Sequence, residues 1–135
     1  MRAVLDVNVL VSAIVFPGTP RSIVSSLEED KFTLVLSPVL LEDQVRVLEK
    51  PKLKRLIVPA IAEEIFVLLH QKGVVVEPKI KLRVCRDPDD DTVLECATAS
   101  GAKIVVSGDE NLLSLGSFHG ISIISPRTFA SRLGL

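Results

Sequence analysis

Acidic side chains recur where short apolar runs of this sequence end. Asp6 lies inside an otherwise apolar run near the N-terminus, Asp109 follows the run Val-Val-Ser-Gly, and four aspartates crowd residues 87–91. Burying a carboxylate in an apolar run is costly unless it is paired, hydrogen-bonded or metal-bound. If these acids converge, they repel one another, and a hard divalent cation with oxygen ligands removes that repulsion. Taken alone, each acid also fits a helix N-cap or a solvated turn.

The elements that must position these acids alternate between strands and helices. Short, β-branched apolar runs predict strands at Ala3–Val7, Phe32–Leu36, Val74–Val76, Ile104–Val106 and Ile121–Ile124. Start and stop residues predict helices at Pro20–Glu29, Pro38–Glu49, Pro59–Gln71, Asp90–Ser100, Asn111–Leu115 and Arg127–Leu133. This alternation predicts an α/β three-layer sandwich around a central parallel sheet of about five strands. Ligand sites in such sheets form beyond the carboxyl ends of the strands, which would place Asp6 and Asp109 at one edge.

Composition narrows the function classes. The chain has 135 residues and a net charge of −1, which predicts one domain over residues 1–135 and excludes a strongly basic coat for duplex DNA. With no Trp, no Tyr and five Phe, a broad aromatic platform for single strands is excluded. Cys85 and Cys96 fit buried thiols in a reducing compartment. No apolar run has membrane-spanning length, and Asp6 and Asn8 interrupt any signal-peptide core, so we expect a cytoplasmic protein with no membrane partner.

Helical phase separates neighbouring acids in the two acidic helices. In the helix from Pro38, the expected apolar face consists of Leu40, Leu41, Val45, Val47 and Leu48. At about 100° per residue, Asp43 borders that face, whereas Glu42 falls on the polar face. In the helix from Asp90, the same reasoning places Asp90 toward the cleft and Asp91 toward water, as a cap or an outer group.

Taken in order, the acidic motifs resemble the PIN-domain nucleases, and most closely their prokaryotic VapC-type toxin branch. Val-Leu-Asp-Val-Asn-Val-Leu-Val-Ser-Ala resembles the first strand of that family, and Leu-Ser-Pro-Val-Leu-Leu-Glu-Asp-Gln-Val resembles its second strand and acidic helix. Arg-Asp-Pro-Asp-Asp-Asp-Thr-Val-Leu-Glu-Cys-Ala and Ile-Val-Val-Ser-Gly-Asp-Glu-Asn resemble its third and fourth acidic motifs. The resemblance covers essentially the whole chain and implies a PIN-like fold.

The resemblance implies a Mg²⁺- or Mn²⁺-dependent ribonuclease that is the toxin of a toxin–antitoxin pair. The acidic positions of the family carry over to Asp6, Asp43, Asp90 and Asp109, of which Asp6, Asp90 and Asp109 would hold the metal. Four more residues would act beside them, namely Asn8, Ser107, Asp91 and Glu42. The family usually has Glu where this chain has Asp43, so Glu42 stays an alternative for the second acidic position. An antitoxin protein and a homodimer are the implied partners besides RNA.

Several Lys and Arg side chains could position RNA. They are a weaker signal than the acids, because such residues are also common on ordinary solvated surface. The candidates are Arg21, Arg46, Lys50, Lys52, Lys54, Arg55, Arg83 and Arg86. Two other acidic α/β classes fit less well: a phosphoaspartyl enzyme of the haloacid-dehalogenase type needs a second acid where Asn8 stands, and a receiver domain needs an Asp after a mid-chain strand, where Ser37-Pro38 stands. A catalytically weak or inactive PIN-fold module that binds RNA or protein stays open.

Overall fold

Six short strands form one sheet in the computed structural model, which describes all 135 residues. The strands are β1 Arg2–Leu5, β2 Thr33–Leu36, β3 Val74–Val75, β4 Ile104–Val106, β5 Ser117–Phe118 and β6 Ile121–Ile124. Their order across the sheet is β3-β2-β1-β4-β6-β5, and every neighbouring pair is parallel except β5 with β6. This architecture confirms the expected α/β fold with a mostly parallel central sheet.

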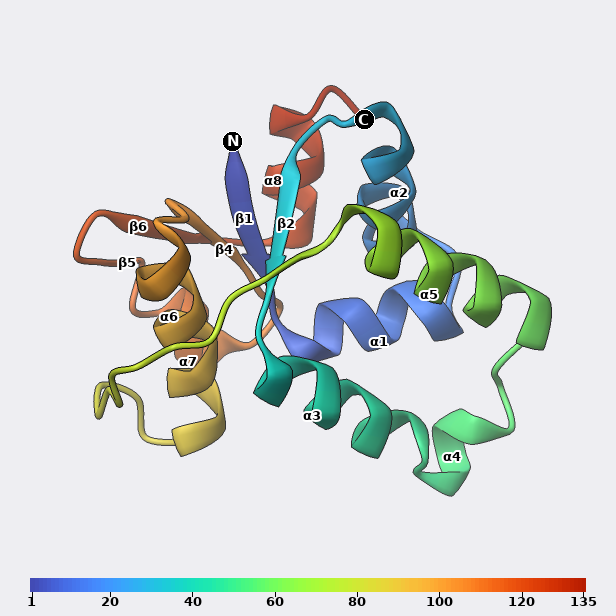
Figure 1. Ribbon diagram of the computed structural model, residues 1–135, viewed down its shortest axis with the longest axis horizontal. Helices are drawn as coiled ribbons and strands as arrows, with labels where there is room; N and C mark the ends of the chain where they lie inside the picture. The colour runs from blue at the N-terminus through green and yellow to red at the C-terminus, as the bar shows by residue number, and fades with distance from the viewer.

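Helices cover both faces of the sheet (Figure 1). They are α1 Val7–Val15, α2 Thr19–Ser25, the 3-10 turn Ser26–Glu29, α3 Pro38–Leu48, α4 Pro51–Lys54, α5 Pro59–Lys72, α6 Pro88–Ser100, α7 Glu110–Leu113 and α8 Pro126–Arg132. Alternate residues of β1 point to opposite sides: Ala3 and Leu5 pack with α1, α2, α5 and α8, whereas Val4 packs with α6 and α7. Two cores separated by the sheet therefore make the three layers.

The first strand is shorter than the sequence predicts. It ends at Leu5, and Val7 begins α1, which the sequence analysis missed. Asp6 forms the junction as the N-cap of α1. Six of the nine residues of α1 are buried, so its sequence is apolar almost throughout and lacks the helical periodicity that separates a helix from a strand. The carboxylate of Asp6 is thus not inside a strand but at its carboxyl end.

The additional strand is β5, which forms a tight hairpin with β6 that the sequence analysis also missed. Strand β5 pairs antiparallel with β6, and the two residues between them, His119 and Gly120, both have positive φ, at 47° and 81°. Positive φ at both central positions is the geometry of a type I′ turn, whose twist matches that of the flanking strands. Only two residues long, β5 gives too short an apolar run to be read as a strand.

Helix α3 differs from its predicted face at one position. Leu40 and Leu48 are buried as expected, but Val45 is 55% exposed and the neighbouring Gln44 is buried. The basic residues 50–55 contain the one-turn helix α4. In Figure 1, α3 runs from the end of β2 away from the sheet, with α4 at its far end.

No single helix has the length and apolar composition that crossing a bilayer requires. The segments Val7–Val15 and Thr19–Glu29 meet both conditions only as a pair, and the chain bends by 94° between them.

Candidate active site

Six aspartates meet around one pocket at the carboxyl ends of β1 and β4. Because these strands are parallel neighbours, with Leu5 opposite Val106, the residues that follow them emerge side by side. The pocket has a volume of about 160 Å³ and is lined by Asp6, Val7, Asn8, Asp43, Arg46, Val47, Asp87, Asp89, Asp90, Val93 and Asp109. The structure thus brings together all four acids that the sequence analysis selected as catalytic candidates.

Asp6 is the most deeply placed of these carboxylates, at 5% exposed. The Val9 N–H donates to its Oδ1 at 2.9 Å, and the Ser107 hydroxyl donates to its Oδ2. Burial raises the pKa of Asp6, and the charge of Asp109 raises it further, whereas the hydrogen bonds from Ser107 and Val9 oppose the shift. Asp6 therefore joins the start of α1 to the loop after β4.

Ser107 connects two of the acids directly. It is fully buried, and its Oγ both donates to Asp6 and accepts from the Asp109 N–H at 3.0 Å. Asp109 in turn caps α7, where its Oδ1 accepts from the Asn111 N–H at 2.9 Å. The serine that precedes the last acid therefore fixes the loop that carries that acid.

Asp90 enters the pocket from the first turn of α6. Its Oδ2 is buried and has no hydrogen-bond partner. Burial raises the pKa of Asp90 to about 6, and the charges of Asp109, Asp87 and Asp6 add to the shift. A carboxylate oxygen that is buried, unpartnered and surrounded by like charges is destabilised unless a proton or a cation joins it.

The helical phase predicted that the neighbouring Asp91 faces water, and this prediction is wrong. Asp91 is 5% exposed, and its Oδ1 accepts from the Val84 N–H at 3.1 Å and the Cys85 N–H at 2.8 Å. Glu95, one turn later, accepts from the Leu82 N–H at 2.8 Å. The chain before α6 folds back over this side of the helix, which a helical wheel cannot show, so Asp91 anchors that segment instead of capping the helix in solvent.

Asp87 and Asp89 also line the pocket, although the sequence analysis did not select them. Asp87 is the N-cap of α6 and accepts from the Asp89 N–H at 3.0 Å. The helix begins at Pro88, two residues before the predicted start at Asp90, so the helical phase was not applied to Asp89 and the aspartate run itself was the remaining signal.

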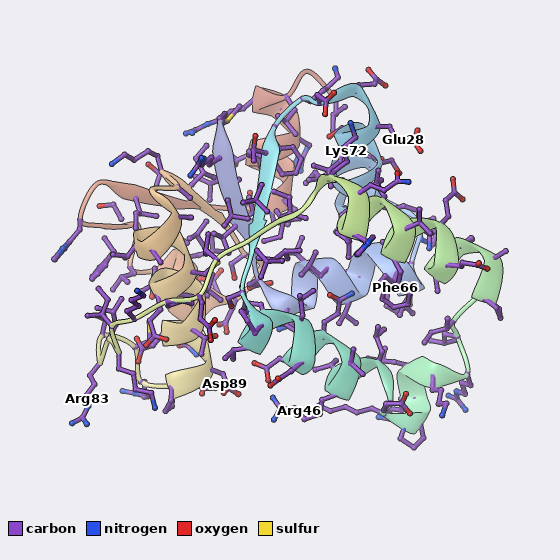
Figure 2. All side chains as sticks on the ribbon, in the orientation of Figure 1. Glu28, Arg46, Phe66, Lys72, Arg83 and Asp89 are labelled. Carbon is purple, nitrogen blue, oxygen red and sulfur yellow. The ribbon has the colours of Figure 1, made fainter.

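Helix α3 contributes one carboxylate and one guanidinium to the opposite wall of the pocket. Asp43 and Arg46 form an ion pair at 2.6 Å, with their side chains 17% and 66% exposed. Figure 2 shows Arg46 on α3 and Asp89 at the start of α6, the two elements that flank the pocket. Glu42 is exposed and does not line this pocket, so α3 presents Asp43 there and turns Glu42 away.

The remaining candidates divide by position. Asn8 is exposed and lines both the acidic pocket and a neighbouring one that also contains Asp109. None of the other candidate RNA-binding cations lines the acidic pocket. Those of the α4 region, Lys50, Lys52, Lys54 and Arg55, are exposed. Lys54 pairs there with Glu49 at 3.1 Å.

The donor set fits a hard divalent cation. All the acidic ligands are carboxylates, and the orphaned Oδ2 of Asp90 lacks the partner that a cation would provide. No three His, Cys, Asp or Glu side chains already stand in a coordination cluster. Mg²⁺ needs only one or two protein carboxylates, because it keeps several of its waters. The pocket therefore suits a cation of this kind better than one that demands a complete protein cage.

Comparisons with known proteins agree with the fold. The family model PIN_3, described as PIN domain, matches residues 2–111. The uncharacterized protein MJ1680 of Methanocaldococcus jannaschii is 31% identical over 121 residues, which cover 85% of this chain and 75% of the relative. Among solved structures, VapBC2 from Rickettsia felis, crystallised with a DNA fragment from its promoter, superposes with a TM-score of 0.60. That match covers 93% of this chain and 98% of the other at 15% identity, so it is a likeness of fold.

Proposed function

Because the chain belongs to the PIN domain family, we propose that it is a ribonuclease that uses Mg²⁺ or Mn²⁺ to hydrolyse RNA phosphodiester bonds. The observation that supports this most directly is the pocket at the ends of β1 and β4, where six aspartates converge. Two of them, Asp6 and Asp90, have raised pKa values because they are buried near other carboxylates. A bound cation would offset the repulsion between these carboxylates, and such perturbed groups in one cleft indicate a functional site.

In this proposal, Asp6, Asp90 and Asp109 hold the metal. When bound, the divalent cation would activate a water molecule and offset negative charge on the phosphate. Ser107 keeps Asp6 and the Asp109 loop in register through its two hydrogen bonds. Asn8, which is exposed and lines the pocket, would contact the substrate or its water. We expect products with 5′-phosphate and 3′-hydroxyl ends, as the family resemblance implies.

We propose further that the protein is the toxin of a toxin–antitoxin pair and acts in the cytoplasm. The likeness of fold to VapBC2 supports this assignment. A small reading frame beside the gene, with a DNA-binding N-terminal segment, would be the expected antitoxin. Purification of the two proteins together would test the pairing, and the mass of the purified chain alone would test the homodimer.

The decisive experiment is cleavage of a labelled RNA with Mn²⁺ and with EDTA, for the wild type, Asp90→Asn and a Glu64→Gln control. The Asp90 Oδ2 has no partner in the protein, so this substitution removes charge without breaking a hydrogen bond at that atom. Glu64 is an exposed acid on α5 and matches the change in charge. We expect Mn²⁺-dependent cleavage that Asp90→Asn abolishes and Glu64→Gln preserves. RNA binding without cleavage by the wild type would instead favour an inactive binding module.

A further inference from the structure

The ion pair between Asp43 and Arg46 in the pocket wall sets Asp43 apart from the acids that we propose hold the metal. Among the pocket-lining side chains, six are aspartates and Arg46 is the only cation. Asp43 is the aspartate that already has a cationic partner, at 2.6 Å from the Arg46 guanidinium. The remaining acids are bound to backbone N–H groups or to Ser107, or, like one oxygen of Asp90, to nothing.

The two partners of this pair are exposed to very different degrees. The Asp43 side chain is 17% exposed, whereas the Arg46 side chain is 66% exposed. For comparison, Lys54 and Glu49 outside the pocket are both 64% exposed, as expected for a freely solvated pair. The Asp43 carboxylate is thus embedded in the wall, and the guanidinium that it holds is largely exposed.

Charge balance gives this guanidinium a role. An RNA phosphate that approaches six carboxylates is repelled, and a metal bound among the deeper acids compensates only at its own position. A guanidinium has five N–H donors in a planar fork, and Arg46 donates to Asp43 through one nitrogen, Nη2. Its other N–H groups are free to bind a phosphate in the bidentate manner that favours arginine over lysine.

We propose that Asp43 acts on the substrate through Arg46: it holds the guanidinium at the pocket entrance, where Arg46 binds an RNA phosphate, and it does not ligate the metal. This inference rests on the proposed function, and it makes Asp43 a positioning residue.

Two binding measurements distinguish a positioning role of Asp43 from a role as a metal ligand. Mn²⁺ affinity is measured by calorimetry without RNA, and affinity for a labelled single-stranded RNA is measured with Ca²⁺ replacing Mn²⁺ to suppress turnover. The variants are Asp43→Asn, Arg46→Gln, their combination, Arg46→Lys and, as the test of the metal site itself, Asp90→Asn. Arg132→Gln and Glu64→Gln are the controls, since both residues are exposed and neither lines the pocket.

We expect Asp43→Asn and Arg46→Gln to leave Mn²⁺ affinity within about twofold of wild type, while Arg46→Gln weakens RNA binding by about tenfold, the scale of a charge-assisted contact. The double variant should be no weaker than Arg46→Gln, because the two residues act as one unit. Arg46→Lys should recover only part of the loss, and Arg46→Gln should make the slope of log affinity against log salt shallower by about 0.7.

Loss of Mn²⁺ affinity in Asp43→Asn with RNA affinity unchanged would overturn the inference and make Asp43 a metal ligand. Additive losses of RNA affinity in the double variant would also overturn it. Failure of the proposed function gives a different result: Asp90→Asn would then leave Mn²⁺ affinity unchanged, whatever the RNA measurements show for Arg46.

Discussion

Replacing Ser107 by alanine should destabilise the protein through the charge of Asp6. The hydroxyl is fully buried and donates to Asp6 Oδ2, and its oxygen accepts from the Asp109 N–H at 3.0 Å. Ser107→Ala removes both bonds and leaves a buried carboxylate oxygen without a donor. Loss of a hydrogen bond to a buried charged group costs about 2–3 kcal/mol. With an unfolding entropy of about 2.1 cal/mol/K per residue, the melting temperature should fall by roughly 7–11 °C.

The assay is thermal unfolding in EDTA at pH 8 and at pH 4.5, with Ser131→Ala as the control on the exposed surface of α8. The hydrogen bond from Ser107 lowers the pKa of Asp6, so it stabilises the ionised form more than the protonated form. The loss should therefore be smaller at pH 4.5 than at pH 8. An equal loss at both values, or none at pH 8, would refute the reasoning, because the hydroxyl would then contribute packing and not support for a charge.

Four other outcomes are expected. Mn²⁺ at 100 times its dissociation constant should add about 2.7 kcal/mol to the free energy of unfolding, roughly 10 °C in a melt, and identical midpoints would refute the metal site. Burial near other carboxylates raises the pKa of Asp90 from 3.8 to about 6, so the stability that this group contributes to the metal-free protein is complete below pH 3.8 and lost as the pH rises through 6; a pH series of melts in EDTA checks this. Asp43→Asn should sharply reduce RNA cleavage at saturating Mn²⁺, Asp43→Glu should be tolerated, and Glu42→Gln should stay near wild type; the reverse pattern would move the site to Glu42. Lys52→Ala with Lys54→Ala should weaken RNA binding across sequences and flatten its salt dependence by roughly 0.7 per lost contact, whereas an unchanged slope would make α4 ordinary solvated surface.

The sequence could predict where the acids emerge, because strand ends are local signals. The apolar runs located the end of β4 but placed the end of β1 two residues too late, and parallel pairing of the two strands places Asp6 beside Asp109. Helix α1 was missed because a buried helix and a buried strand are both continuously apolar. The hairpin at His119 was missed because β5 has two residues.

Errors within α3 and α6 have a common physical cause. A helical wheel assumes one buried face, but each of these helices contacts more than the sheet. The segment before α6 covers Asp91, so the prediction that Asp91 faces water was wrong. On α3, Gln44 is buried in place of Val45. The pair between Asp43 and Arg46 could not be predicted either, since the sequence does not specify which neighbour an arginine contacts.

The attachment of residues 82–85 to α6 has a practical consequence for spectroscopy. Asp91 and Glu95 accept from the backbone N–H groups of Leu82, Val84 and Cys85, so the Arg83 side chain takes no part in these bonds. Arg83 points away from the protein (Figure 2), whereas burial raises the pKa of Cys85 to about 12 and of Cys96 to about 11. Near neutral pH, a thiol-reactive spin label should therefore modify Arg83→Cys in preference to both native cysteines. A nitroxide at that position would sense paramagnetic Mn²⁺ in the acidic pocket by relaxation, without any substrate present.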